Sequence, residues 1–346
     1  MDISAFHPAV ERWFHSSFDR PTAAQTDGWE QIAAGRHTLI EAPTGSGKTL
    51  AAFLWCLNDL LVRPPSEAGV HILYISPLKA LNNDIQRNLE APLAALPLDV
   101  TIGVRTGDTP PSLRARQIRK PPEILITTPE SLYLLLTSSR SQGMFRPLRY
   151  VVLDEIHAIA ATKRGVHLAL SLERLEEALR AGSRAWGLGC GGPDPSPQTP
   201  NPFFVRIGLS ATQKPLETVA RLLGGYHDDG SERPVSIVRA AQDKRIELDV
   251  TYPFADTATG EGDFMQRAAR LILDESATRR STLVFVNARH VCERLAEVIN
   301  KEAGQQVALA HHGSISREQR LETEQALKDG RLPLLIATSS LELGID

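Results

Sequence analysis

Cysteine is scarce in this sequence, which has only Cys56, Cys190 and Cys292 among its 346 residues. They lie far apart and none belongs to a Cys-x-x-Cys pair, so the sequence predicts neither a disulfide framework nor a zinc site. Apolar runs near the ~20 residues needed to span a bilayer are also missing. Charged residues interrupt the N-terminal segment, where a signal peptide would need an apolar core. We therefore expect a protein of the reducing cytoplasm, with no membrane partner.

Positive charge is not in excess either. The chain carries 38 lysine and arginine residues against 41 aspartate and glutamate residues, for a net charge of −3. No overall basic field therefore indicates a polyanionic partner. Nucleic acid still remains a possible partner, because enzymes that act on it can confine their positive charge to one cleft.

Short apolar runs rich in branched residues alternate with helix-like stretches through most of the chain. This alternation predicts parallel sheets covered by helices, the α/β class. Strands are predicted at residues 37–42, 71–75, 100–104, 124–127, 150–153, 205–209, 246–252, 282–286, 307–311 and 334–337. Helices are predicted at residues 50–62, 80–96, 168–179, 289–300 and 316–328.

Composition divides the chain into two predicted domains, residues 1–230 and 231–346. The stretch 224–233, which contains Asp-Asp-Gly-Ser, is the expected exit from the first domain. The stretch 181–202 is rich in Gly, Pro and Ser, so we expect a surface insertion there between two strands. After its first strand-like region the second domain delivers about three strands, whereas an open sheet usually has about five or six. We therefore expect the second domain to be incomplete.

A glycine-rich loop, Ala-Pro-Thr-Gly-Ser-Gly-Lys-Thr at 42–49, lies between a predicted strand and a predicted helix. Glycines let backbone amides curl around phosphate oxygens, and the helix dipole adds to the attraction. Lys48 is expected to reach the β- and γ-phosphates of ATP, and Thr49 to offer its hydroxyl to Mg²⁺. The strict pattern has glycine where this chain has Ala42, and a glycine turn ahead of a surface lysine is the alternative. The strand–turn–helix context favours a nucleotide site. Its predicted residues are Thr44, Gly45, Ser46, Gly47, Lys48 and Thr49.

Two adjacent carboxylates end the apolar strand in Tyr-Val-Val-Leu-Asp-Glu-Ile-His at 150–157. Asp154 is expected to hold Mg²⁺, and Glu155 to orient and deprotonate the attacking water. His157 is a candidate link to a neighbouring motif. A capped strand end with solvated acids is the alternative, but its pairing with the phosphate loop favours catalysis. The predicted catalytic residues are thus Glu155, Lys48, Asp154 and His157.

An ordered series of motifs resembles superfamily 2 helicases of the DExH type, and within them the large helicase-related (Lhr) branch. In chain order, segments 21–25, 42–49, 76–81, 106–109 and 127–132 are similar to the Q motif, motif I, motif Ia, the short motif after it, and motif Ib. Segments 154–157, 210–212, 284–289, 311–314 and 337–346 are similar to motifs II, III and IV, the successor of IV, and motif V. The resemblance implies tandem RecA-like domains, the second incomplete. It also implies an ATP-dependent 3′-to-5′ DNA helicase with a role in DNA repair.

The resemblance also assigns residues outside the phosphate loop. Gln25 of the Q motif is expected to read the adenine of ATP. Gly344 and Asp346 of motif V are expected to contact the nucleotide. Ser210 and Thr212 of motif III are expected to couple hydrolysis to unwinding.

Four further residues follow predicted strands, on the side of an α/β sheet where ligands usually bind. We expect them to hold the backbone of a single-stranded or tailed nucleic acid without reading its bases. DNA is favoured over RNA, as the resemblance implies. Each residue alone could be a capping hydroxyl or a solvated lysine, and their shared place at successive strand ends favours binding. The four are Ser76, Lys79, Thr128 and Thr338.

Motif VI, an arginine-bearing segment expected after motif V, does not occur before Asp346. Residues 1–346 are therefore expected to be the N-terminal part of a longer enzyme, and by themselves to bind ATP without unwinding a duplex. Two alternatives stay open. One is a nucleotide- and nucleic-acid-binding module without unwinding activity, and the other is a related superfamily 2 DNA translocase.

Overall fold

The structure, a computed structural model, describes residues 1–43, 46–77, 85, 89, 91–185, 203–211, 214–240, 248–250 and 261–338. The chain forms two compact units, Met1–Asp243 and Lys244–Asp346. The division falls later than the predicted domain boundary after residue 230. None of the helices in these described ranges is both long and apolar enough to cross a membrane.

Parallel strands build the sheet of the first unit, in the order β3-β4-β2-β5-β6-β1-β7. Strands β2, β4 and β5 are buried along their whole length. Each is a short run of mostly branched or aromatic residues, as expected for parallel strands that are covered on both faces. The strands are β1 (His37–Glu41), β2 (Ile72–Ile75), β3 (Ile102–Arg105), β4 (Ile124–Thr127), β5 (Tyr150–Leu153), β6 (Val205–Ser210) and β7 (Val235–Arg239).

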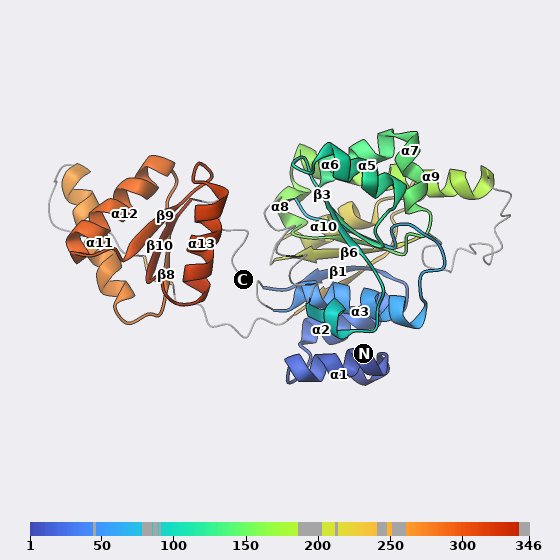
Figure 1. Cartoon of the computed structure of the whole chain (residues 1–346), viewed down its shortest axis with the longest axis horizontal. Helices are drawn as coiled ribbons and strands as arrows, with labels where there is room; N and C mark the ends of the chain where they lie inside the picture. The colour runs from blue at the N-terminus through green and yellow to red at the C-terminus, as the bar shows by residue number, and fades with distance from the viewer. Residues whose placement is uncertain are drawn as a thin grey trace. The chain divides into compact units, whose positions relative to one another are not determined.

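Helices cover both faces of this sheet (Figure 1). One face packs against α1 (Pro8–Ser17), α2 (Ala23–Ala33) and α3 (Lys48–Val62). The other face packs against α6 (Pro129–Thr137), α9 (Lys163–Ala185) and α10 (Leu216–Gly224). The shorter described helices of this unit are η1 (Ile3–Ala5), α5 (Pro111–Arg119), α7 (Ser139–Gln142), η2 (Gly143–Phe145) and α8 (His157–Ala160).

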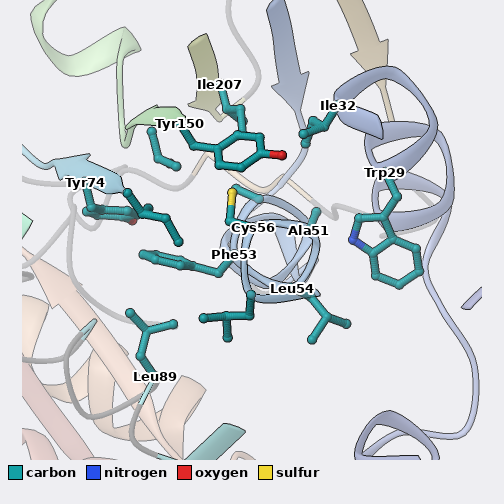
Figure 2. Close-up of a cluster of buried hydrophobic side chains, with 14 of the residues drawn as sticks. Trp29, Ile32, Ala51, Phe53, Leu54, Cys56, Tyr74, Leu89, Tyr150 and Ile207 are labelled. Carbon is teal, nitrogen blue, oxygen red and sulfur yellow. The ribbon is translucent and has the colours of Figure 1, made fainter. Parts of the chain in front are cut away.

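Helix α3 occupies the centre of the core on its face of the sheet (Figure 2). Phe53 stacks on Tyr74 of β2, with ring centroids 4.9 Å apart and an interplanar angle of 17°. Leu54, Cys56 and Leu57 are fully buried. Burying side chains of this size contributes roughly 1.5–3 kcal/mol each. Because α3 begins inside the phosphate loop, this packing fixes the loop against the sheet.

The second unit contains a parallel sheet in the order β8-β10-β9. Its strands are β8 (Thr282–Phe285), β9 (Ala308–His311) and β10 (Leu334–Ala337). Its described helices are α11 (Glu261–Ser276), α12 (Arg289–Ala303) and α13 (Arg317–Lys328). Side chains of α11 and α12 share a buried cluster with this sheet. Both units therefore follow the predicted α/β plan of parallel strands and covering helices.

Most predicted strands are present within a residue or two of their predicted bounds, and the differences concern three regions. Strand β7 was not predicted, and it pairs with β1 in the first sheet although residues 231 onward were assigned to the second domain. The strand predicted at 246–252 is wrong for residues 248–250, which lie in no strand, while the rest of it lies outside the described residues. Most of the helix predicted at 80–96 and residues 186–202 of the predicted insertion also lie outside the described residues.

Candidate functional site

The phosphate loop connects β1 to α3, and Gly47 is the residue on which α3 starts. Its φ is 78° and its ψ is 18°, in the left-handed region that favours glycine. A Cβ at this position would lie 2.6 Å from Gln25 Nε2, too close for any side chain. Both conditions require glycine, which explains this part of the loop pattern. Thr44 and Gly45, predicted to bind nucleotide, lie outside the described residues.

Gln25 fastens the Q motif to the phosphate loop. Its Nε2 donates to the Gly47 carbonyl at 3.4 Å, and its Oε1 accepts from the Thr22 amide at 2.9 Å. Thr22 in turn donates from its hydroxyl to the Ser46 carbonyl at 3.2 Å and caps α2 by accepting from the Gln25 amide at 3.4 Å. The side chain of Gln25 is buried. The residue predicted to read adenine therefore also has a structural role at the loop.

Lys48 lies in the first turn of α3 and is 5% exposed. Its Nζ is 3.4 Å from Glu155 Oε1, an ion pair across the gap between phosphate loop and β5. No hydrogen-bond acceptor among the described residues meets this ammonium in bonding geometry, and the same holds for the buried Ser46 hydroxyl. Buried polar groups without partners are uncommon in proteins. Two such groups in one glycine-rich loop fit a phosphate-bearing ligand, as predicted. Thr49 is partly exposed beside them.

Asp154 follows β5 directly and is 5% exposed. Its Oδ1 accepts from the Glu155 amide at 2.9 Å. Burial, and next the adjacent charge of Glu155, raise the pKa of Asp154 to about 6. Hydrogen bonding by Tyr74 and the charge of Lys48 act in the opposite direction. A buried carboxylate of this kind is stabilised by a cation, so the residue fits the predicted magnesium contact. The described residues contain no group of three or more His, Cys, Asp and Glu side chains placed to hold a metal.

Glu155 and His157 form the next link. Glu155 has a φ of 45°, which is uncommon for a residue with a side chain and is a mark of functional sites. Its Oε2 is 3.3 Å from His157 Nε2. His157 Nδ1 accepts from the Ala211 amide at 3.2 Å. Burial, and next the charge of Lys48, lower the pKa of His157. A neutral ring that accepts at Nδ1 carries its proton on Nε2, which therefore donates to Glu155.

The end of β6 lies beside both the phosphate loop and His157. The Ser210 carbonyl accepts from the Ala42 amide at 3.0 Å, and Ser210 pairs in register with Glu41 of β1. The Ser210 hydroxyl donates to the carbonyl of Ala211 at 2.8 Å. Motif III is therefore bonded on one side to the start of the phosphate loop and on the other to motif II. Thr212, its predicted coupling partner, lies outside the described residues.

Two of the predicted nucleic-acid contacts lie at the ends of neighbouring strands. Ser76 follows β2 and is fully buried, and its amide donates to the Thr127 carbonyl at 3.0 Å. Thr128 follows β4 and caps α6, accepting from the Ser131 amide at 3.4 Å. The capping role is the alternative that the sequence left open for this hydroxyl. Thr338 belongs to the second unit, where its amide donates to His311 at 3.1 Å.

The structure thus brings together Gln25, Ser46, Lys48, Asp154, Glu155, His157 and Ser210, along one edge of the first sheet. Lys79, Gly344 and Asp346 lie outside the described residues, so their predicted contacts stay predictions. Two participants were missed. Tyr74 acts on Asp154 from inside an apolar strand, and Ala211 acts through its backbone amide. A tyrosine in a buried strand gives no distinguishing sequence signal, and a backbone amide gives none at all.

Comparison with known families gives two matches along the chain. Residues 22–220 match the model for DEAD/DEAH box helicases, and residues 263–346 match the helicase conserved C-terminal domain. The chain is 41% identical to the Lhr helicase/probable uracil glycosylase of Mycolicibacterium smegmatis, over 99% of this chain and 24% of that protein. It is 42% identical to the ATP-dependent helicase Lhr-Core of Methanothermobacter thermautotrophicus, over 99% of this chain and 39% of that protein.

A solved structure is also similar. It is that of the Mycobacterium smegmatis helicase Lhr bound to ssDNA and AMP-PNP, with 42% identity and a TM-score of 0.80. The similarity covers 100% of this chain and 43% of that one. The chain thus spans less than half the length of each of these relatives. These similarities confirm the resemblance to the Lhr branch and the tandem RecA-like fold that the motif series indicates.

Proposed function

This chain belongs to the DEAD/DEAH box helicase family, and on that basis we propose that it couples ATP hydrolysis to movement along single-stranded nucleic acid. We further propose 3′-to-5′ movement, DNA as the favoured substrate and a role in DNA repair. A similar structure binds ssDNA and AMP-PNP, which supports the choice of ligands. The observation that carries the proposal is the bonded series Lys48–Glu155–His157–Ala211, which joins the phosphate loop to motif III. A cytoplasmic location remains a prediction.

The phosphate loop holds the nucleotide in this proposal. Lys48 places a buried ammonium beside the glycine-rich turn, where it binds the terminal phosphates of ATP. Asp154 and Thr49 would hold Mg²⁺, which when bound neutralises phosphate charge. Asp154 suits this task because its buried carboxylate, pressed by the neighbouring Glu155, gains stability from a nearby cation.

Glu155 acts as the general base. The carboxylate takes a proton from the water that attacks the terminal phosphorus, and the water oxygen forms the new bond to phosphorus while the bond to the leaving ADP oxygen breaks. Its two oxygens face Lys48 and His157, so its orientation is determined from both sides. When Lys48 binds phosphate, the His157 contact still holds the carboxylate in place.

His157 is a positioning residue that couples this base to motif III. Its neutral ring donates to Glu155 and accepts from Ala211, so a movement of the β6 end changes the orientation of the base. Ser76 and Thr128 lie at the ends of β2 and β4 on the same sheet edge. Contacts there with phosphates of a single strand would be largely independent of base sequence.

The experiment that tests this function measures ATP hydrolysis by the full chain with and without single-stranded DNA. Hydrolysis should require Mg²⁺ and rise with DNA. His157→Ala should reduce the stimulation by about tenfold, roughly the worth of one hydrogen bond to a charged group, and leave the affinity for ATP nearly unchanged. His157→Gln, which can still donate and accept, should restore part of the stimulation. Hydrolysis that ignores nucleic acid in the wild type would overturn the proposed function.

Gln25 should determine the preference for adenine. Gln25→Ala should reduce the ratio of ATP to GTP affinity by about tenfold, the energy of one or two lost hydrogen bonds. Gln25→Glu keeps an acceptor for the Thr22 amide but loses the donor, so it separates base reading from capping. Calorimetry with both nucleotides gives the ratio. If both variants lose affinity for ATP and GTP in equal proportion, Gln25 acts on the loop alone.

A further inference from the structure

The short helix α5 and the strand before it carry a concentration of positive charge in a chain whose net charge is −3. Between residues 105 and 120 the only acidic residue is Asp108. We call the basic side chains of this stretch the α5 basic patch. Its members are Arg105, Arg114, Arg116, Arg119 and Lys120.

Helix α5 is not built as a core helix. Gln117 is its only buried residue, and Gln117 Nε2 donates to the Val104 carbonyl of β3 at 3.0 Å. Arg114 Nη2 donates to the carbonyls of Thr106 and Gly107 at 3.1 and 2.6 Å. A helix that buries so little apolar surface contributes little to the hydrophobic stabilisation of the domain. What α5 presents instead is charge.

The arginines at the inner side of the patch are held by backbone rather than by acids. Arg105 Nη1 donates to the Arg114 carbonyl at 3.1 Å. Burial, and next the charge of Arg114, lower the pKa of Arg105. The two guanidinium groups therefore lie close enough to repel each other. Carbonyl oxygens satisfy their N–H groups but do not neutralise their charge.

The outer members of the patch, Arg116, Arg119 and Lys120, are exposed. Within the described part of the chain, no ion pair joins any of the five members to a carboxylate, whereas buried Arg206 and Arg233 each bind two. Five cations without a carboxylate partner create a positive potential that favours an anion of extended shape.

The position of the patch indicates which anion. Strand β3 is an edge of the sheet, next to β4 and then β2. Arg105 pairs in register with Thr127, whose hydroxyl donates to the Arg105 carbonyl at 2.7 Å. The carboxyl ends of β2, β4 and β3 therefore place Ser76, Thr128 and Arg105 in order along one edge. The patch continues this line onto α5.

We propose that the α5 basic patch binds the sugar-phosphate backbone of the nucleic acid, beyond the part held at the ends of β2 and β4. This inference rests on the proposed function, because it extends the same path. The other use of charge at an edge strand is to prevent pairing between copies of the sheet. That use requires no anion and makes a different prediction, namely self-association once the charge is removed.

The test compares two double variants of the full chain with equal loss of charge. Arg116→Gln/Arg119→Gln removes exposed members of the patch, and Arg12→Gln/Arg140→Gln removes exposed arginines of α1 and α7. Binding of a long single-stranded DNA is measured against salt concentration. The slope of log affinity against log salt should fall by about 1.4 for the patch variant, at about 0.7 per lost phosphate contact, and stay unchanged for the control. On an oligonucleotide too short to reach α5, the patch variant should bind like the wild type.

Three other results are distinguishable. Equal slopes for wild type, patch variant and control on the long strand would overturn the inference. Equal slopes together with dimers of the patch variant in light scattering would assign the patch to edge protection, and also overturn it. Absence of nucleic-acid binding by the wild type would instead remove the proposed function on which the inference rests.

Discussion

Replacing Glu155 by glutamine should lower the turnover number for ATP hydrolysis by about 10²–10⁴-fold, the usual contribution of a positioned general base. The amide keeps the shape of the carboxylate but does not accept a proton from water. It also leaves Lys48 free of the ion pair at 3.4 Å, so the affinity for ATP should not fall. Rapid-quench hydrolysis assays and calorimetry on the full chain separate the two effects.

A matched control for this variant is Glu177→Gln. Glu177 lies on α9, its side chain is 59% exposed, and it pairs with Arg180 at the surface. Its substitution removes the same charge without reaching the site, and turnover should remain at the wild-type level. If Glu155→Gln hydrolyses ATP as fast as this control does, another group must act as the base.

The parts of the fold that could be predicted are those with local causes. The runs Ile72–Ile75 and Tyr150–Leu153 are apolar throughout and bounded by polar or turn residues, so each reads as a buried parallel strand. The phosphate loop was predictable because glycine at Gly47 is required by backbone conformation and by the closeness of Gln25. The carboxylates that follow β5 were recognised because strand ends of such sheets are where ligands bind.

The parts that could not be predicted have causes far away in sequence. Strand β7, Val235–Arg239, lies just after the turn-rich stretch that was taken for a domain exit, and its pairing partner is β1, some two hundred residues earlier. Short segments of mixed polarity become strands only when such a partner is present. The contact between His157 and the Ala211 amide likewise depends on how β5 and β6 lie side by side. The α5 basic patch is visible in sequence as a run of arginines, but only the structure shows that their charge is not neutralised.

A cluster near the amino ends of β1 and β6 gives the first unit a sensitivity to acid. His37 is buried at the start of β1, and its Nδ1 accepts from the Arg206 amide at 3.0 Å. Arg206 is buried too, and its guanidinium binds Glu176 at 2.6 Å. Burial, and next the charges of Arg206, Arg233 and His227, lower the pKa of His37 to about 3. A proton on this ring would lose the Arg206 hydrogen bond and add a charge among cations.

Lowering the pH from 7 to 5 should therefore reduce the free energy of unfolding by about 2 kcal/mol through His37 alone. In the unfolded chain its pKa is near the ordinary 6.5, so the ring is protonated at pH 5, whereas the folded ring stays neutral down to about pH 3. Between these values the unfolded state binds more protons, and stability rises with pH. At pH 5 the loss depends almost entirely on the unfolded pKa, since the folded one lies well below.

His37→Asn measures this contribution directly, because the asparagine oxygen can accept from the Arg206 amide without titrating. Its free energy of unfolding should fall by about 2 kcal/mol less than that of the wild type between pH 7 and pH 5. His227→Asn, at an exposed position nearby, should follow the wild type. Urea denaturation of the three chains at both pH values gives the comparison. Equal losses for wild type and His37→Asn would show that this ring is already protonated in the folded chain, or that the buried cluster relaxes to accept the charge.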